Sequence, residues 1–221
     1  MVADYPARQH YQDGRIAASY DAQYNDPIRW ANLRERVFGW REERAFLHLL
    51  RRVPEGGAVL DIPAGTGRYV KHLLDRGHQV GGADISEEML QVARRRIGQH
   101  PNLLFLETAD AASLPYPDGR FDGVTCIRLY HLVPPDLRPK MLREVKRVGK
   151  GWAILYFGMA SPWLALRRAT RGRLIGRPIG DAYPVSPRDM RQELDAAGMR
   201  LEDARWVWPW LADGMVVRVS W

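Results

Sequence analysis

The amino-acid sequence predicts an α/β fold, a doubly wound and mostly parallel seven-stranded sheet that ends in an antiparallel hairpin. Short apolar segments alternate with amphipathic helical segments at the spacing of βαβ units. The stretch AVLDIPAGTGRY, residues 58–69, has the pattern of a strand that ends in an acid, passes through a Gly-rich loop and enters a helix. Two final strand-like segments are joined by a loop that contains Asp213 and Gly214, which is typical of a hairpin.

Composition limits the classes of protein that are compatible with this chain. Its 221 residues suffice for one sizeable α/β domain and would be cramped as two. Apolar residues make up 46%, and no apolar run approaches the roughly 20 residues of a membrane span. The first residues lack the apolar core of a secretory signal, so a cytoplasmic location is expected. The single Cys126 excludes a disulfide framework and a multi-cysteine metal site, and no metal is expected.

The chain is basic, with a net charge of +7 from 33 basic and 26 acidic residues. Almost all the basic residues are arginine. An anionic partner and a general composition bias both explain this charge, and the bulk value does not separate them.

Residues 1–53 are expected to form an N-terminal helical arm. Residues 5–25 are polar and carry Tyr11, Tyr20 and Tyr24 without a core-forming pattern. Residues 27–52 have the apolar spacing of an amphipathic helix, with Gly39 as a candidate break. The turn PEGG then opens the α/β domain, residues 54–221.

After the glycine loop, strands and helices alternate. Helices are expected at 68–76, at 86–96 with Ser86 as its cap, and at 134–148. Strands are expected at 79–84, 103–106, 121–129 and 151–157. Pro139 must fall in the first turn of its helix or break it. A helix capped by Ser186 is expected at 186–197, followed by strands at 201–208 and 215–221. Between these parts, an insert at about 161–185 carries five arginines against one acid.

Two acidic residues after the next two strands narrow the kind of ligand that the glycine loop is expected to bind. Asp84 ends the strand after the loop, where a carboxylate can accept hydrogen bonds from both hydroxyls of a ribose. Asp110 follows the next strand, and an L-P-Y-P-D turn then leads to Phe121 and Asp122. With this constellation the sequence resembles the class I S-adenosylmethionine-dependent methyltransferases, in their small methyltransferase-domain branch, strongly over residues 58–157 and in architecture to residue 221.

The resemblance implies a Rossmann-like fold, S-adenosylmethionine as cofactor and S-adenosylhomocysteine as product. It implies that the loop wraps the methionine part, Asp84 holds the ribose, Ile85 and Met89 flank the adenine, and Asp110 and the Ala111 backbone read its edge. The implied cofactor-binding set is Asp61, Pro63, Ala64, Gly65, Thr66, Gly67, Asp84, Ile85, Met89, Asp110, Ala111 and Arg128.

Each of these roles has a plainer alternative. Asp61 is equally compatible with satisfying loop donors, and Asp84 with interacting favourably with a helix N-terminus. Ile85 and Met89 are equally compatible with packing in the core. Tyr130 and His131, after the fourth strand, are implied to lie near the reacting centre and are the catalytic candidates, although His131 also fits a packed or substrate-orienting role.

The loop departs from the family pattern D-x-G-x-G-x-G at its first glycine, which is Pro63 here. Proline keeps its carbonyl acceptor but has a fixed φ and no N–H. We therefore expect cofactor binding through a slightly altered loop. A dinucleotide fingerprint, G-x-G-x-x-G, is absent, which disfavours an oxidoreductase.

The sequence gives fewer indications of the methyl acceptor than of the cofactor. Substrate or lid candidates are Tyr11, Tyr20, Tyr24, Arg168 and Tyr183. The tyrosine-rich arm fits a lid over the cofactor or a packed surface segment. The arginine-rich insert fits a solvated face, recognition of an anionic small molecule, or contact with nucleic acid or a membrane surface.

We expect methyl transfer to a small-molecule acceptor, anionic or lipid-like. An RNA methyltransferase and a non-catalytic S-adenosylmethionine-binding partner subunit remain as alternatives. The oligomeric state is left open by the sequence.

Overall fold

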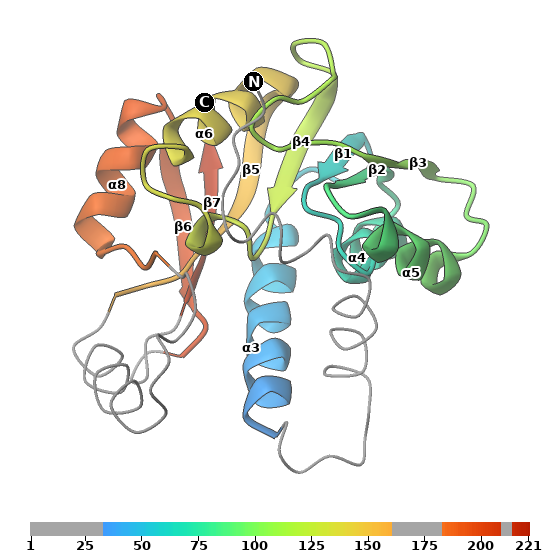
Figure 1. Ribbon diagram of the computed structural model, residues 1–221, viewed down its shortest axis with the longest axis horizontal. Coiled ribbons are helices and arrows are strands. Elements are labelled where there is room, and N and C mark those ends of the chain that lie inside the picture. The colour runs from blue at the N-terminus through green and yellow to red at the C-terminus, as the bar shows by residue number, and fades with distance from the viewer. Residues whose placement is uncertain (1–32, 161–182, 209–213) are drawn as a thin grey trace.

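The computed structural model describes residues 33–160, 183–208 and 214–221 (Figure 1). Its elements, in chain order, are α3 (Leu33–Leu50), β1 (Ala58–Asp61), α4 (Arg68–Asp75), β2 (Gln79–Asp84), α5 (Glu87–Ile97), β3 (Leu103–Thr108), β4 (Phe121–Cys126), the short 3₁₀ helix η2 (Tyr130–Leu132), α6 (Arg138–Val148), β5 (Gly149–Phe157), α8 (Pro187–Ala196), β6 (Arg200–Trp206) and β7 (Met215–Ser220).

The seven strands form one sheet in the order β3-β2-β1-β4-β5-β7-β6. The strands from β3 to β5 pair in parallel, and β7 pairs antiparallel with both β5 and β6. The predicted fold class and its C-terminal hairpin are therefore confirmed. The order of the parallel strands reverses between β1 and β4, which makes this the topological switch point of the sheet.

Helices cover both faces of the sheet (Figure 1). Side chains alternate along β5, so that Ala153, Leu155 and Phe157 join one core cluster while Trp152, Ile154 and Tyr156 join the other. The first cluster contains α6 and α8 residues such as Met141, Leu142, Met190 and Leu194. The second contains Phe46, Leu49 and Leu50 of α3 together with Val70 and Leu73 of α4. The helix α3 is thus part of the core that supports the sheet.

Capping residues fix where two helices begin, as predicted. The Ser86 hydroxyl accepts from the Met89 N–H at the start of α5, and Ser186 accepts from the Asp189 N–H at the start of α8. Acidic residues occupy the first turn of α5 and arginines its last turn, which suits the helix dipole.

Three of the predicted elements differ most clearly from those observed. The helix α3 continues through Gly39 without a break, because Phe38 and Phe46 on either side of this glycine pack against the core and the Gly39 carbonyl accepts from Arg68 Nη2 at 2.9 Å. The helix α6 begins at Arg138 rather than Pro134, with Pro139 in its first positions, where no N–H is required. The strand β4 ends at Cys126 rather than Leu129, because Arg128 adopts a left-handed conformation with a φ of 65°.

Candidate functional site

The predicted site residues meet at the carboxyl edge of the parallel strands. Backbone hydrogen bonds join the segments there: the Ile62 N–H donates to the Thr125 carbonyl at 2.9 Å, and the Ala64 N–H donates to the Ala83 carbonyl at 2.8 Å. The Ala109 N–H donates to the Asp84 carbonyl at 2.9 Å. The ends of β1, β2, β3 and β4 therefore form one continuous edge at the switch point, where open α/β sheets bind their ligands.

The glycine loop uses its two glycines differently. Gly65 has a φ of 52°, and a Cβ built on it would meet nothing within 4 Å, so open space lies beside this backbone. Gly67 has a φ of 79° and begins α4, and a Cβ there would lie 2.9 Å from Ile97 Cδ1 and 3.0 Å from Ala93 Cβ. Gly67 therefore permits close packing of the loop on α5, while Gly65 leaves room for a ligand to approach the backbone.

Asp84 supports the loop directly. Its Oδ2 accepts from the Gly65 N–H at 2.7 Å and its Oδ1 accepts from the Ser86 N–H at 3.0 Å. Burial raises the pKa of Asp84 to about 6, although these hydrogen bonds oppose the shift. Each carboxylate oxygen can accept more than one hydrogen bond, so these contacts are compatible with a further donor from a ligand.

Asp61 is the most deeply buried acid of the site. Its Oδ1 accepts from the Thr125 hydroxyl at 2.6 Å, and its Oδ2 has no hydrogen-bond partner among the described residues. Burial, with a smaller effect from the charge of Asp84, raises the pKa of Asp61 to about 7. A buried acceptor without a partner is costly in a folded protein, so this oxygen suits a donor brought by a ligand.

The remaining loop positions are partly or fully buried. Pro63, the residue that departs from the family pattern, is half-buried. Ala64 is buried, and the Thr66 hydroxyl accepts from Arg96 Nη1 at 3.0 Å. The loop thus has one anchor on β2 through Ala64 and another on α5 through Thr66.

The predicted adenine-side residues lie next along the edge. Ile85 is half-buried, and Met89 is buried on the first turns of α5. Asp110 Oδ1 accepts from the Ala112 N–H at 2.8 Å, which fixes a tight turn after β3. Ala111 lies within this turn and is buried.

Arg128 is held by an acid from another element. Its Nε donates to both carboxylate oxygens of Glu42 at 2.8 Å, and Glu42 is fully buried on α3. The Tyr69 hydroxyl donates to the same carboxylate at 2.5 Å. The structure thus places Arg128 at the predicted edge and connects it with α3 and α4.

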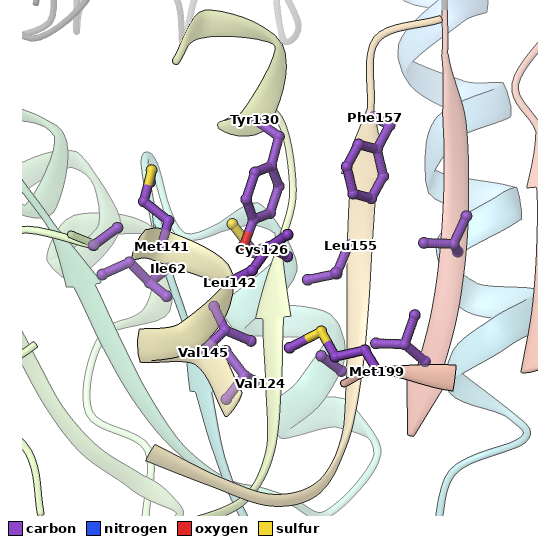
Figure 2. Close-up of a cluster of buried hydrophobic side chains, with 14 of the residues drawn as sticks. Ile62, Val124, Cys126, Tyr130, Met141, Leu142, Val145, Leu155, Phe157 and Met199 are labelled. Carbon is purple, nitrogen blue, oxygen red and sulfur yellow. The ribbon is translucent and has the colours of Figure 1, made fainter. Parts of the chain in front are cut away.

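Tyr130 points into the core (Figure 2). It is fully buried, stacks on Phe157 with ring centroids 5.2 Å apart, and directs its hydroxyl toward Cys126. Burial, together with the neighbouring Cys126, raises the pKa of Tyr130 well above its usual range. This environment suits a supporting side chain better than a proton acceptor.

His131 lies on the same 3₁₀ helix and is half-buried. Its ring meets Tyr156 edge to face, with centroids 5.4 Å apart, and its backbone carbonyl accepts from the Tyr183 N–H at 2.6 Å. The absence of a side chain at Gly158 allows His131 to lie close to the backbone there, because a Cβ on Gly158 would be 2.6 Å from His131 Cβ. The structure therefore brings His131 and Tyr183, two predicted candidates, together.

The other acceptor-side candidates, Tyr11, Tyr20, Tyr24 and Arg168, lie outside the described residues, as does most of the basic insert. Within the described ranges, no group of His, Cys, Asp and Glu side chains has the arrangement of a metal site. None of the helices in those ranges has the length and apolar character required to cross a membrane.

Sequence reasoning missed Glu42, Thr125 and Arg138. Glu42 stands on the apolar stripe of α3, one turn before Phe46, and this unusual position was the available signal. Arg138 is buried: its Nε donates to the Tyr130 and Val133 carbonyls at 3.1 and 3.2 Å, its Nη2 donates to the Tyr183 carbonyl, and its Nη1 pairs with Glu193 at 3.2 Å. No local pattern predicted that this arginine would face inward.

Comparison with known proteins supports the same interpretation. Residues 59–151 match the family model of a methyltransferase domain. A demethylmenaquinone methyltransferase of Symbiobacterium thermophilum is 44% identical over 102 residues, 43% of this chain and 39% of the relative. The ubiquinone/menaquinone biosynthesis C-methyltransferase UbiE of Pseudomonas fluorescens is 40% identical over 124 residues, 53% of this chain and 47% of the relative. The matched region thus spans less than half of either relative.

A solved structure extends the likeness to almost the whole fold. The magnesium protoporphyrin IX methyltransferase of Synechocystis, with bound S-adenosylhomocysteine, has a TM-score of 0.80 at 19% identity and covers 97% of both chains. At this identity the likeness is one of fold. Residues 59–151 thus match the sequence model of a methyltransferase domain, and the chain shares the fold of a methyltransferase that was solved with bound S-adenosylhomocysteine.

Proposed function

We propose that this protein transfers a methyl group from S-adenosylmethionine to a small-molecule acceptor. The observation that carries the proposal is the contact between Asp84 and the Gly65 N–H at 2.7 Å, which sets a buried carboxylate against an open glycine loop at the switch point. An acid and a glycine loop in this relation suit a ligand that carries a ribose.

Four residues support the fit of the cofactor. Asp84 offers carboxylate oxygens to ribose hydroxyls, and the open side of Gly65 allows close approach to the backbone. The unpartnered Oδ2 of Asp61 offers an acceptor for a donor such as an ammonium group. Where the family pattern has its first glycine, Pro63 retains a carbonyl oxygen.

Alignment at the edge of the sheet accounts for most of the proposed chemistry. When bound, S-adenosylmethionine supplies an electrophilic methyl group on a sulfonium. The residues of the chain orient the reactants, and a base is needed only when the acceptor must lose a proton. His131 is the described side chain that we assign to the acceptor side, because it is half-buried while Tyr130 is fully enclosed.

A small-molecule acceptor is supported by the kinds of protein that resemble this chain. The names of the two curated relatives refer to demethylmenaquinone and to ubiquinone or menaquinone biosynthesis, and that of the structural neighbour to magnesium protoporphyrin IX. A further neighbour was crystallised with 1,6-didemethyltoxoflavin, at 18% identity and a TM-score of 0.61. We propose that the acceptor is likewise a small molecule, anionic or lipid-like.

Calorimetry with S-adenosylmethionine and S-adenosylhomocysteine tests the cofactor assignment first. We expect saturable binding of one molecule per chain, weakened in Asp84→Asn and unchanged in the control Glu87→Gln, whose exposed carboxylate pairs with Arg94. A Kd of about 1 mM corresponds to a binding free energy of only about −4 kcal/mol, so the absence of binding at about 1 mM cofactor would contradict the proposal. A screen for release of S-adenosylhomocysteine across quinols, porphyrins, phenols and RNA would then identify the acceptor.

A further inference from the structure

We propose that Glu42 is a positioning residue of the cofactor site, because it joins the two chain segments that flank the switch point. This inference rests on the proposed function. It assigns α3 a direct part in shaping the site, in addition to its part in the core.

The contacts of Glu42 are those of a built ion-pair centre. Its carboxylate is fully buried and accepts from the Tyr69 hydroxyl at 2.5 Å and from Arg128 Nε at 2.8 Å. A buried carboxylate is costly unless it is paired and hydrogen-bonded, and both conditions are met here. Arg128 also lies over the Phe38 ring of α3, with its Cζ 5.7 Å from the ring centroid.

The two partners stand on opposite sides of the switch point. Tyr69 is the second residue of α4, the helix that follows the glycine loop. Arg128 is the second residue after β4 and has a φ of 65°, a conformation that residues with a Cβ adopt rarely and at a cost in free energy. One carboxylate therefore fixes the start of α4 and the turn after β4 relative to each other.

Docking of α3 does not require a charge at this position. Phe46, Leu49 and Leu50 already anchor the helix in the core, and Glu43 ties it to α4 through Arg68 and through His72 Nε2 at 2.6 Å. Buried ion pairs can often be replaced by apolar residues without loss of stability. We therefore assign the Glu42 carboxylate to the geometry of the site rather than to the attachment of the helix.

A double-mutant cycle tests this assignment. Glu42→Gln, Arg128→Met and the double variant are compared by the affinity for S-adenosylhomocysteine, measured by calorimetry, and by urea unfolding of the free protein. Glu43→Gln is the matched control, since it removes the neighbouring tie between the same two helices. Glu42→Gln and Arg128→Met should each raise the Kd about tenfold relative to the wild type. The double variant should also show a Kd raised about tenfold and no further, because both substitutions disrupt the same interaction, and the Kd of Glu43→Gln should stay within about twofold of the wild-type value.

A spectroscopic measurement on the free protein gives a readout that does not depend on the cofactor. The ¹⁵N–¹H signal of Arg128 Nε should be displaced in Glu42→Gln and unchanged in Glu43→Gln. Should Glu42→Gln fail to fold, Tyr69→Phe removes the hydrogen bond from the Tyr69 hydroxyl to Glu42, and we expect it to raise Kd about threefold.

Three results would overturn the inference: additive effects in the cycle, an equal loss of affinity in Glu43→Gln, or an unaltered Kd in Glu42→Gln and Tyr69→Phe. In each of these the wild-type chain still binds the ligand. A wild-type chain that does not bind S-adenosylhomocysteine would instead overturn the proposed function, and the role of Glu42 in that site with it.

Discussion

Replacing Asp61 with Asn should make the stability of this protein less dependent on pH. Asp61 is fully buried, and burial raises its pKa from an ordinary value of 3.8 to about 7. Between these values the folded chain holds a proton that the unfolded chain has already lost. Stability therefore falls as pH rises through this window, because ionising the folded carboxyl costs free energy that the exposed carboxyl does not require.

The size of the effect follows from the same values. Between about pH 5 and pH 7, each pH unit lowers the free energy of unfolding by about 1.4 kcal/mol. Asp61 alone should therefore lower it by about 3 kcal/mol between pH 5 and pH 8. Asn is nearly isosteric and its amide oxygen can still accept from the Thr125 hydroxyl, but it does not ionise. The variant should therefore lack this decrease.

Urea unfolding of the wild type and of Asp61→Asn at pH 5 and pH 8 measures the difference. Burial raises the pKa of Asp84 to about 6, so Asp84 lowers the free energy of unfolding by a smaller amount over the same pH range. Both proteins contain Asp84, so its contribution does not account for the difference between them. Glu43 acts in the opposite direction, since a hydrogen bond from His72 lowers its pKa to about 2, but its effect lies below pH 4.5. Equal pH dependence in the two proteins would refute the reasoning.

Three further substitutions test the site and its supports. Asp84→Ala should weaken cofactor binding by about 1–3 kcal/mol in calorimetry, because charge-assisted hydrogen bonds are lost. Gly67→Ala should cost about 2–4 kcal/mol of stability in urea unfolding, since a positive φ and contacts near 3 Å both oppose a Cβ. Arg138→Met should cost about 3–5 kcal/mol, because it leaves Glu193 and three backbone carbonyls without their buried partner.

Matched controls make these outcomes decisive. Gly56 also has a positive φ, of 71°, but open space around it, so Gly56→Ala should cost only about 1 kcal/mol. Arg200 pairs with Glu202 at the surface, and Arg200→Met should change stability by less than about 1 kcal/mol. A control as damaging as its buried counterpart would contradict the packing argument, and an unchanged affinity in Asp84→Ala would contradict the ribose assignment.

Much of the fold was predictable because local patterns and tertiary packing agree. The Ser86 and Ser186 caps mark helix starts, and the strands at 79–84 and 58–61 carry the apolar residues of a buried sheet. The errors fall where tertiary contacts override local preference. Gly39 predicted a break, but packing of α3 on the core keeps the helix continuous.

The candidate site was predictable only in part, for a similar reason. The residues of the glycine loop and the two acids after the next strands are adjacent to recognisable strand ends, so the sequence alone brings them to one edge. Glu42 is 86 positions from Arg128, and no spacing rule connects a helix before the sheet with a turn after its fourth strand. A buried charge on an apolar stripe indicates a partner but does not identify it.

The position of β7 has a consequence for how this chain folds during synthesis. Although β7 follows β6 in sequence, it lies between β5 and β6 in the sheet. Until residues 215–220 have left the ribosome, β5 exposes a strand edge and β6 has no neighbour on the sheet. Exposed edges invite pairing with other chains, so an unfinished nascent chain is a candidate substrate for chaperones, and a chain stopped before Met215 should aggregate.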